Sequence, residues 1–119
     1  MYSAAVLDHF NRPRNAGELV DATATVEVSN PVCGDVLQLA ARVENGRIVN
    51  TRFKAKGCVT AVACGSCLAE MLHQLTVADA RKITSQALSD SLGGLPPATL
   101  HGAQLAFDAL QTLLEKLRG

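Results

Sequence analysis

The sequence predicts an α+β fold, in which a three-stranded antiparallel β-meander carries helices packed on one face. In the first half of the 119 residues, apolar and polar side chains alternate, which is the two-residue period of a β-strand. In the second half, apolar residues recur every three or four positions, which is the period of an amphipathic helix. A chain of this length is near the commonest domain size, so we expect one domain over residues 1–119.

The first half contains a short helix followed by the strands. Residues 3–11 place apolar side chains on one helical stripe, and Pro13 ends that helix. Alternation then predicts three strands, at residues 23–29, 37–43 and 49–55. Asn45 and Gly46 separate the last two strands, and both tolerate the positive φ of a type I′ turn, so we expect a hairpin there.

The second half reads as helices joined by short connections. The helical period covers three segments, at residues 60–75, 76–87 and 100–117. The first of these carries a single apolar stripe. Thr76 is a good N-cap for the second, with Asp79 three residues further on. Residues 93–97, Gly-Gly-Leu-Pro-Pro, predict a loop before the last helix.

Composition excludes several classes of function. Eleven basic residues balance eleven acidic ones, so no long-range field attracts the chain to nucleic acid or to an acidic membrane surface. No apolar run approaches the roughly 18 residues of a membrane span, and the N-terminus lacks the pattern of a signal peptide. A cytoplasmic location follows as an expectation. In that compartment, four cysteines favour ligands, reactive thiols or core residues over disulfides.

Four ligand-capable side chains occupy loop or helix-start positions. Cys33 and Asp35 flank a glycine between two predicted strands, Cys58 directly precedes the first long helix, and His101 opens the last one. Two thiolates, a carboxylate and an imidazole could complete a tetrahedral metal site. The helix N-terminus should also lower the pKa of Cys58, because free N–H groups there favour the thiolate. The spacing alone leaves a metal site and ordinary loop residues equally open.

The remaining two thiols form a C-x-x-C pair, Cys64 and Cys67. A thioredoxin-like redox pair belongs at a helix start, whereas this pair falls inside a predicted helix. Cys64 lies on the apolar stripe and is interpreted as a small buried hydrophobe. For Cys67 both interpretations stay open.

Five blocks of the sequence, taken in order, resemble the IscU/NifU-type iron–sulfur cluster assembly scaffolds over about residues 2–114. They are Tyr2 with residues 6–10 and 13–17, then residues 30–35 (Asn-Pro-Val-Cys-Gly-Asp), 53–58 (Phe-Lys-Ala-Lys-Gly-Cys), 61–66 (Ala-Val-Ala-Cys-Gly-Ser), and 95–97 (Leu-Pro-Pro) followed by His101.

The resemblance implies a scaffold or carrier and not an enzyme. Such a protein accepts persulfide sulfur from a cysteine desulfurase, binds iron, builds a labile [2Fe–2S] cluster and passes it to apo iron–sulfur proteins. The family's ligands map to Cys33, Asp35, Cys58 and His101, with persulfide sulfur expected on Cys33 or Cys58. Zinc is the alternative occupant of the site. The resemblance also implies a monomer or homodimer.

Two departures from the family pattern bear on function. Gly102 stands where the family has a third cysteine, a cluster ligand and sulfur acceptor, and whether Cys64 or Cys67 replaces it is left open. Ala98 and Thr99 replace the Val-Lys of chaperone-recruiting members, so recruitment of an Hsp70-type chaperone also stays open. Three functions therefore compete: a cluster scaffold, a zinc-binding or sulfur-accepting protein without a cluster role, and a C-x-x-C thiol redox protein.

Overall fold

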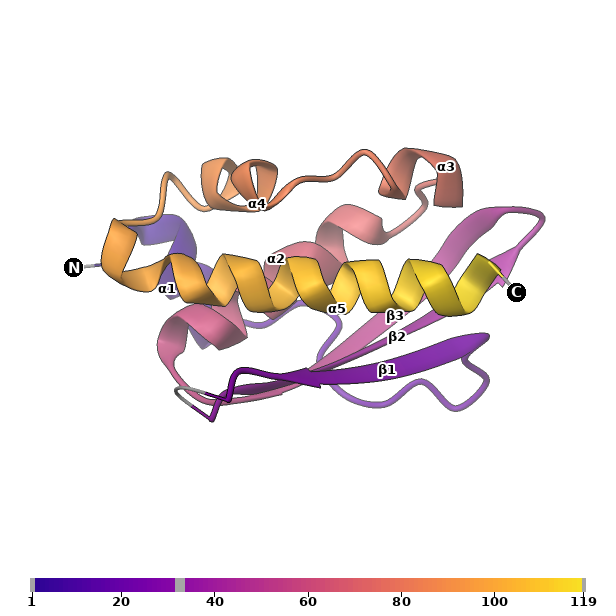
Figure 1. The fold of residues 1–119 in the computed structure, drawn as a ribbon, viewed down its shortest axis with the longest axis horizontal. Coiled ribbons are helices and arrows are strands. Elements are labelled where there is room, and N and C mark those ends of the chain that lie inside the picture. The colour runs from indigo at the N-terminus through magenta and orange to yellow at the C-terminus, as the bar shows by residue number, and fades with distance from the viewer. Residues whose placement is uncertain (1, 32–33, 119) are drawn as a thin grey trace.

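The computed structural model describes residues 2–31 and 34–118, and the α+β class is confirmed (Figure 1). Its elements run in the order α1 (Ala4–Asn11), β1 (Ala24–Ser29), β2 (Val36–Glu44), β3 (Arg47–Lys56), α2 (Val59–Leu72), α3 (Val77–Ala80), α4 (Ser85–Ser91), a 3₁₀ turn η1 (Pro97–Thr99) and α5 (Leu100–Arg118). The strands come first and the long helices later, as the two sequence periods predict.

The three strands form the predicted antiparallel meander, in the order β1-β2-β3. Asn45 and Gly46 have φ angles of 55° and 77°, which confirms the type I′ turn between β2 and β3. A register irregularity after Arg42 pairs Val43 with Ile48. As a result Ile48, and not Val49 as the alternation predicted, is fully buried at this end of the hairpin.

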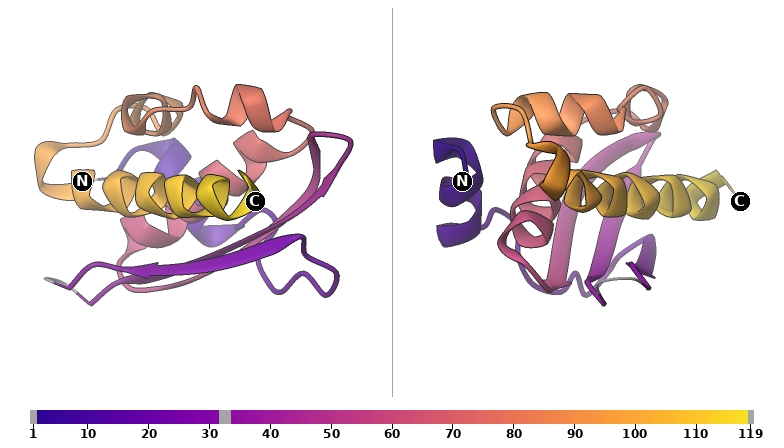
Figure 2. Two further views of the ribbon diagram at one scale, coloured as in Figure 1. Left: turned by 45° about the vertical axis from the view of Figure 1, so that its right-hand side comes forward. Right: turned by 60° about the vertical axis from the view of Figure 1, so that its left-hand side comes forward.

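Helix α2 is the centre of the molecule. It packs against β3, α1 and α5, so that protein surrounds it on several sides (Figure 2). The prediction of a single apolar stripe on this helix was therefore wrong, because its buried residues cover almost the whole circumference. Gly65 explains how closely it approaches the sheet: a Cβ there would lie 2.8 Å from Phe53 Cδ2 and 2.9 Å from Leu37 Cδ1.

Helices α1 and α5 lie on different sides of α2, and α5 also packs on β1 and β2 (Figure 2). The predicted helix over 76–87 is divided in two. Thr76 caps α3 as expected, accepting a hydrogen bond from the Asp79 N–H at 3.0 Å. Thr84 is a second N-cap, accepting from the Ala87 N–H at 3.1 Å, and it begins α4.

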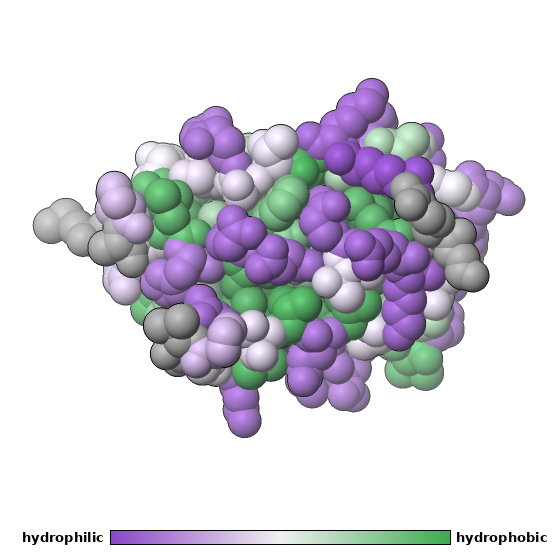
Figure 3. All heavy atoms as spheres, in the orientation of Figure 1, coloured by the Kyte–Doolittle hydropathy of each residue, from purple (hydrophilic) through white to green (hydrophobic). Residues whose placement is uncertain are grey.

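The described helices include none that combines the length and the apolar character needed to cross a membrane. On the face seen in Figure 3, hydrophilic side chains spread across the region of α5, and hydrophobic ones show between them. The surface on this side is thus mixed in polarity.

Candidate metal centre

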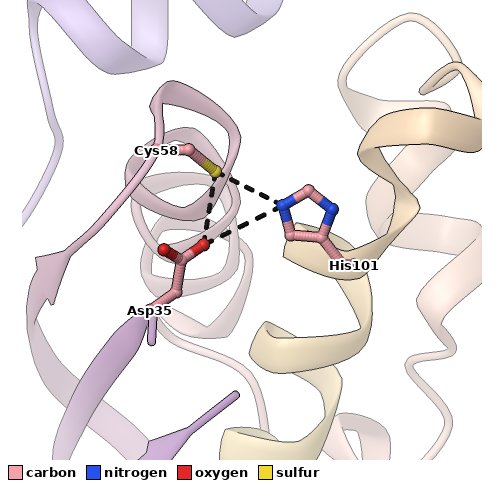
Figure 4. Close-up of side chains that lie close together, drawn as sticks. All are labelled: Asp35, Cys58 and His101. Carbon is pink, nitrogen blue, oxygen red and sulfur yellow. Dashed lines mark hydrogen bonds and ion pairs between the residues drawn. The ribbon is translucent and has the colours of Figure 1, made fainter. Parts of the chain in front are cut away.

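Three of the four predicted ligand residues come together at one end of the sheet. The Cys58 Sγ lies 3.3 Å from Asp35 Oδ2 and 3.4 Å from His101 Nε2. His101 Nε2 and Asp35 Oδ2 are 3.9 Å apart. Figure 4 shows the three side chains pointing toward one another from three separate parts of the chain. The fourth predicted ligand, Cys33, lies outside the described residues.

Asp35 is held at the start of β2 by the backbone of the loop before it. The Asn30 N–H donates to the Asp35 carbonyl at 2.8 Å, and the Gly34 N–H donates to the Asn30 carbonyl at 2.7 Å. These two bonds close the β1–β2 connection. They leave the Asp35 side chain directed inward, and only 7% of it is exposed.

Cys58 is the N-cap residue of α2, with extended backbone, and Gly57 directly precedes it. Gly57 has a φ of 143°, which L side chains rarely adopt, and a Cβ on it would overlap the Asp35 carboxylate. The glycine therefore lets the strand end pass directly against Asp35. This contact brings the carboxylate and the Cys58 thiol to the same place.

His101 lies in the first turn of α5, after η1, whose start is formed by Pro96 and Pro97. Its side chain is 37% exposed, so it forms the solvent side of the cluster. The sequence-based expectation that the Pro-Pro loop precedes a helix carrying His101 is confirmed.

Burial raises the pKa of the Cys58 thiol above its ordinary value, and the neighbouring Asp35 carboxylate raises it further. The N–H groups of Ala61 and Thr60 at the start of α2 lower the pKa, as predicted, but by less than burial and Asp35 raise it. The expectation of a lowered pKa was wrong. Without a metal, the thiol is the resting form and donates a hydrogen bond to Asp35.

The spacing of the three donor atoms suits a metal ion. Tetrahedral zinc, with bonds of about 2.0–2.3 Å, requires ligand atoms roughly 3.3–3.6 Å apart. The separations of 3.3 and 3.4 Å from the Cys58 Sγ lie in that range, and the separation of 3.9 Å between His101 and Asp35 is somewhat wider. One sulfur, one nitrogen and one oxygen donor form a borderline set that zinc and iron both accept. A bound cation would also displace the thiol proton.

Cys64 and Cys67 lie inside α2 and are buried, with 0% and 3% of their surface exposed. Burial raises the pKa of Cys64 to about 12 and that of Cys67 to about 11. Both are free thiols, and neither belongs to the group of donors formed by Asp35, Cys58 and His101. These properties are typical of buried hydrophobic cysteines and do not favour a redox pair.

Two residues that matter for the site were not singled out as functional by sequence reasoning. Gly57 was noted only as a neighbour of Cys58, although a glycine directly before a candidate ligand can signal a close backbone approach. Thr60 is buried against α5 at Gly102, a contact between distant parts of the chain with no local signal in the sequence.

The whole chain is similar to a known protein family and to named relatives. The family model described as NifU-like N terminal domain matches residues 1–119. Over 111 residues the chain is 43% identical to Iron-sulfur cluster assembly scaffold protein IscU 1 of Archaeoglobus fulgidus, covering 93% of this chain and 72% of that protein. It is 38% identical over 116 residues to the IscU scaffold protein of Aquifex aeolicus, covering 96% and 74%. It is 37% identical over 126 residues to Nitrogen fixation protein NifU of Trichormus azollae, covering 99% and 42%.

Solved structures share the fold. A NifU-like protein (N-terminal) from Brucella abortus superposes with a TM-score of 0.79 at 15% identity, covering 97% of this chain and 92% of that one. The SUF-system protein FiSufU from Fervidobacterium islandicum AW-1 gives a TM-score of 0.76 at 18% identity, covering 95% and 96%. At these identities the likeness concerns the fold alone.

Proposed function

The chain belongs to the NifU-like N-terminal domain family, and from this membership we propose that it is an iron–sulfur cluster assembly scaffold. Relatives with 38–43% identity over most of the chain carry that name, which supports the proposal over a thiol redox role. The observation that carries it is the convergence of Asp35, Cys58 and His101.

In this proposal the [2Fe–2S] cluster is cargo, held by Cys33, Cys58, Asp35 and His101. Thiolates are the usual ligands of iron–sulfur clusters, while a carboxylate is a poorer match for this chemistry. Asp35 would therefore be the ligand that keeps the cluster exchangeable. A scaffold needs such a ligand, because its product is useful only after release.

Sulfur would enter by persulfide transfer from a cysteine desulfurase. The thiolate of Cys58 or Cys33 attacks the outer sulfur of the desulfurase persulfide, forming a new S–S bond. The S–S bond of the donor breaks, and its thiolate leaves with the electron pair, so no external oxidant is required. Apo iron–sulfur proteins would receive the finished cluster. Because Cys58 has a raised pKa, we expect transfer to be faster once iron or a partner removes its proton.

Anaerobic reconstitution with iron, cysteine and a desulfurase tests the function. We expect visible charge-transfer absorbance in the wild-type protein and its loss in Cys58→Ser. Cys67→Ser is the matched control, because Cys67 is a free thiol of the same region that is not among the donors. A wild type that gains no absorbance, or an unchanged spectrum in Cys58→Ser, would contradict the proposal.

Zinc binding without a cluster role is the second candidate, because the three donors suit zinc as well as iron. Metal analysis of protein purified without oxygen separates the two. Stoichiometric zinc that iron and sulfide do not displace would support the zinc protein. Zinc that is replaced during reconstitution would support the scaffold.

A further inference from the structure

Gly102, one residue past His101, packs directly against Thr60 at the start of α2. A Cβ on Gly102 would lie 2.6 Å from the Thr60 Cγ2, a separation that real Cβ atoms essentially never show. It would also lie 3.1 Å from the carbonyl carbon and oxygen of Thr60. Gly102 is a buried residue of α5 and has no positive φ, so the glycine is required here for space and not for backbone conformation.

We propose that Thr60 determines the ligand set of the metal centre: its γ-methyl fills the space where a side chain on residue 102 would begin, and so excludes a third thiol beside His101. The proposal deepens the proposed function and rests on it for its consequence in metal binding. The steric part of the proposal, the clash between the Thr60 methyl and a side chain on residue 102, does not depend on metal binding.

Thr60 cannot easily make room. It is 1% exposed, so its methyl group has no solvent to turn into. β-Branched side chains are also restricted at χ1 in a helix. The two contacts with the Thr60 backbone, at 3.1 Å, are tight but would be relieved by a shift of a few tenths of an ångström, so the methyl group is the main obstacle. With that methyl in place, any side chain on residue 102 must push the first turn of α5 away from α2.

That displacement would act directly on the metal centre. His101 is the neighbour of Gly102, and its Nε2 lies 3.4 Å from the Cys58 Sγ at the start of α2. Moving the first turn of α5 separates these two donors. A single Gly102→Cys substitution would thus weaken the existing site instead of adding a ligand, whereas removing the Thr60 methyl first would open the position.

A metal-free stability cycle tests the steric part. Alanine is intrinsically better than glycine inside a helix, so Gly102→Ala should stabilise α5 unless the new Cβ clashes. We expect Gly102→Ala to lower Tm by about 5–15 °C. In the Thr60→Ser background, Gly102→Ala should lower Tm by less than half as much. Thr60→Val is the matched control. It keeps a methyl group in place, so Gly102→Ala should lower Tm by the full amount in this background. A neutral Gly102→Ala, or an equal loss in the Thr60→Ser background, would overturn the proposal.

Cobalt(II) titration tests the consequence for ligands, with the thiolate-to-cobalt band as readout. Gly102→Cys alone should weaken cobalt binding. Thr60→Ser with Gly102→Cys should strengthen the band, because one thiolate is added to the ligand set. A Gly102→Cys variant that gains the extra thiolate without any change at Thr60 would refute the proposal. If wild type binds no cobalt, the proposed metal function fails, while the stability cycle still decides the steric claim.

Discussion

Gly57 shows how one residue without a side chain shapes the candidate metal centre. Its φ of 143° and the Asp35 carboxylate beside it leave no place for a Cβ. Because Gly57 has no side chain, the Asp35 carboxylate can lie against its backbone and reach the Cys58 thiol. Substitution at this position should damage both folding and binding.

We expect Gly57→Ala to lower the free energy of unfolding by about 3 kcal/mol or more, since the strained φ and the collision with Asp35 add. Zinc affinity should fall at least about tenfold, because the displaced carboxylate no longer meets the other donors. Gly46→Ala is the control: Gly46 also has a positive φ, 77°, but open space around it. It should cost about 1–2 kcal/mol and leave zinc affinity unchanged. Equal zinc affinities in the two variants, measured by competitive titration, would contradict this role.

At the residue scale, the sequence was sufficient to predict that Asp35, Cys58 and His101 lie together, and their role as metal ligands stays a prediction. Asp35, Cys58 and His101 each stand beside a local marker, a glycine, a strand end or a Pro-Pro pair, and they do converge. The pKa of Cys58 was predicted in the wrong direction, because the helix N-terminus is visible in a sequence and the burial of a thiol is not. The Thr60–Gly102 contact was unpredictable for the same reason: it depends on how two distant helices meet.

At the scale of elements, α1 is attached to α2 by a polar contact that crosses the interface. His9, 8% exposed, places its Nδ1 2.7 Å from the Ser66 Oγ, which also accepts the Arg14 N–H at 2.8 Å. In the neutral tautomer whose Nδ1 accepts the Ser66 hydroxyl proton, the ring proton is on Nε2, 3.8 Å from Glu70 Oε1. Neutral His9 fits this arrangement.

Burial lowers the pKa of His9 below its ordinary value, and the Arg14 charge lowers it further, while Glu70 and Asp8 raise it. Below about pH 6.5, the unfolded chain therefore binds a proton that the folded chain resists. The contribution of His9 to the free energy of unfolding should be fully present above about pH 6.5 and should decline as the pH falls below that value.

We expect His9→Asn to flatten this decline in urea-unfolding curves measured between about pH 7 and pH 5, because the group that takes up the proton on unfolding is absent. His73→Asn serves as the control, since His73 is exposed at the end of α2. It should keep the wild-type pH dependence. The same pH dependence in His9→Asn as in the wild type would show that another group is responsible.

Predictability differed between elements for physical reasons. The strands and their hairpin were predicted well, because alternation and the Asn45–Gly46 turn are local signals. Helix α2 was misjudged, since a helix buried on almost every side has no single apolar stripe to detect. The boundary between α3 and α4 was not predicted. Thr84, the N-cap of α4, lies within a segment in which the helical period of the sequence continues without a break.

At the scale of the whole molecule, the candidate metal centre brings together three separate parts of the chain. Asp35 precedes β2, Cys58 begins α2 and His101 lies at the start of α5. A cation bound by all three would join the sheet, the central helix and the C-terminal helix, so that unfolding any of them requires its release.

We therefore expect zinc to stabilise the entire fold. At a zinc concentration about 1,000 times the dissociation constant, binding adds about 4 kcal/mol to the free energy of unfolding, which corresponds to a rise in Tm of about 10 °C or more. His101→Ala should lose most of this rise, while His73→Ala should retain it. Scanning calorimetry with and without zinc measures the effect. An undiminished rise in His101→Ala would show that the metal does not bind α5.

The described donors differ in their exposure, so the site is more open to solvent on one side than on the other. Asp35 is 7% exposed on its side chain and lies at the closed inner wall, whereas His101 is 37% exposed and stands at the opening. A thiolate from a receiving protein approaches from solvent and so reaches the His101 side first. We expect the first new thiolate–iron bond to form on the His101 side during cargo transfer, while the weakly bound Asp35 carboxylate remains the ligand that gives way most easily.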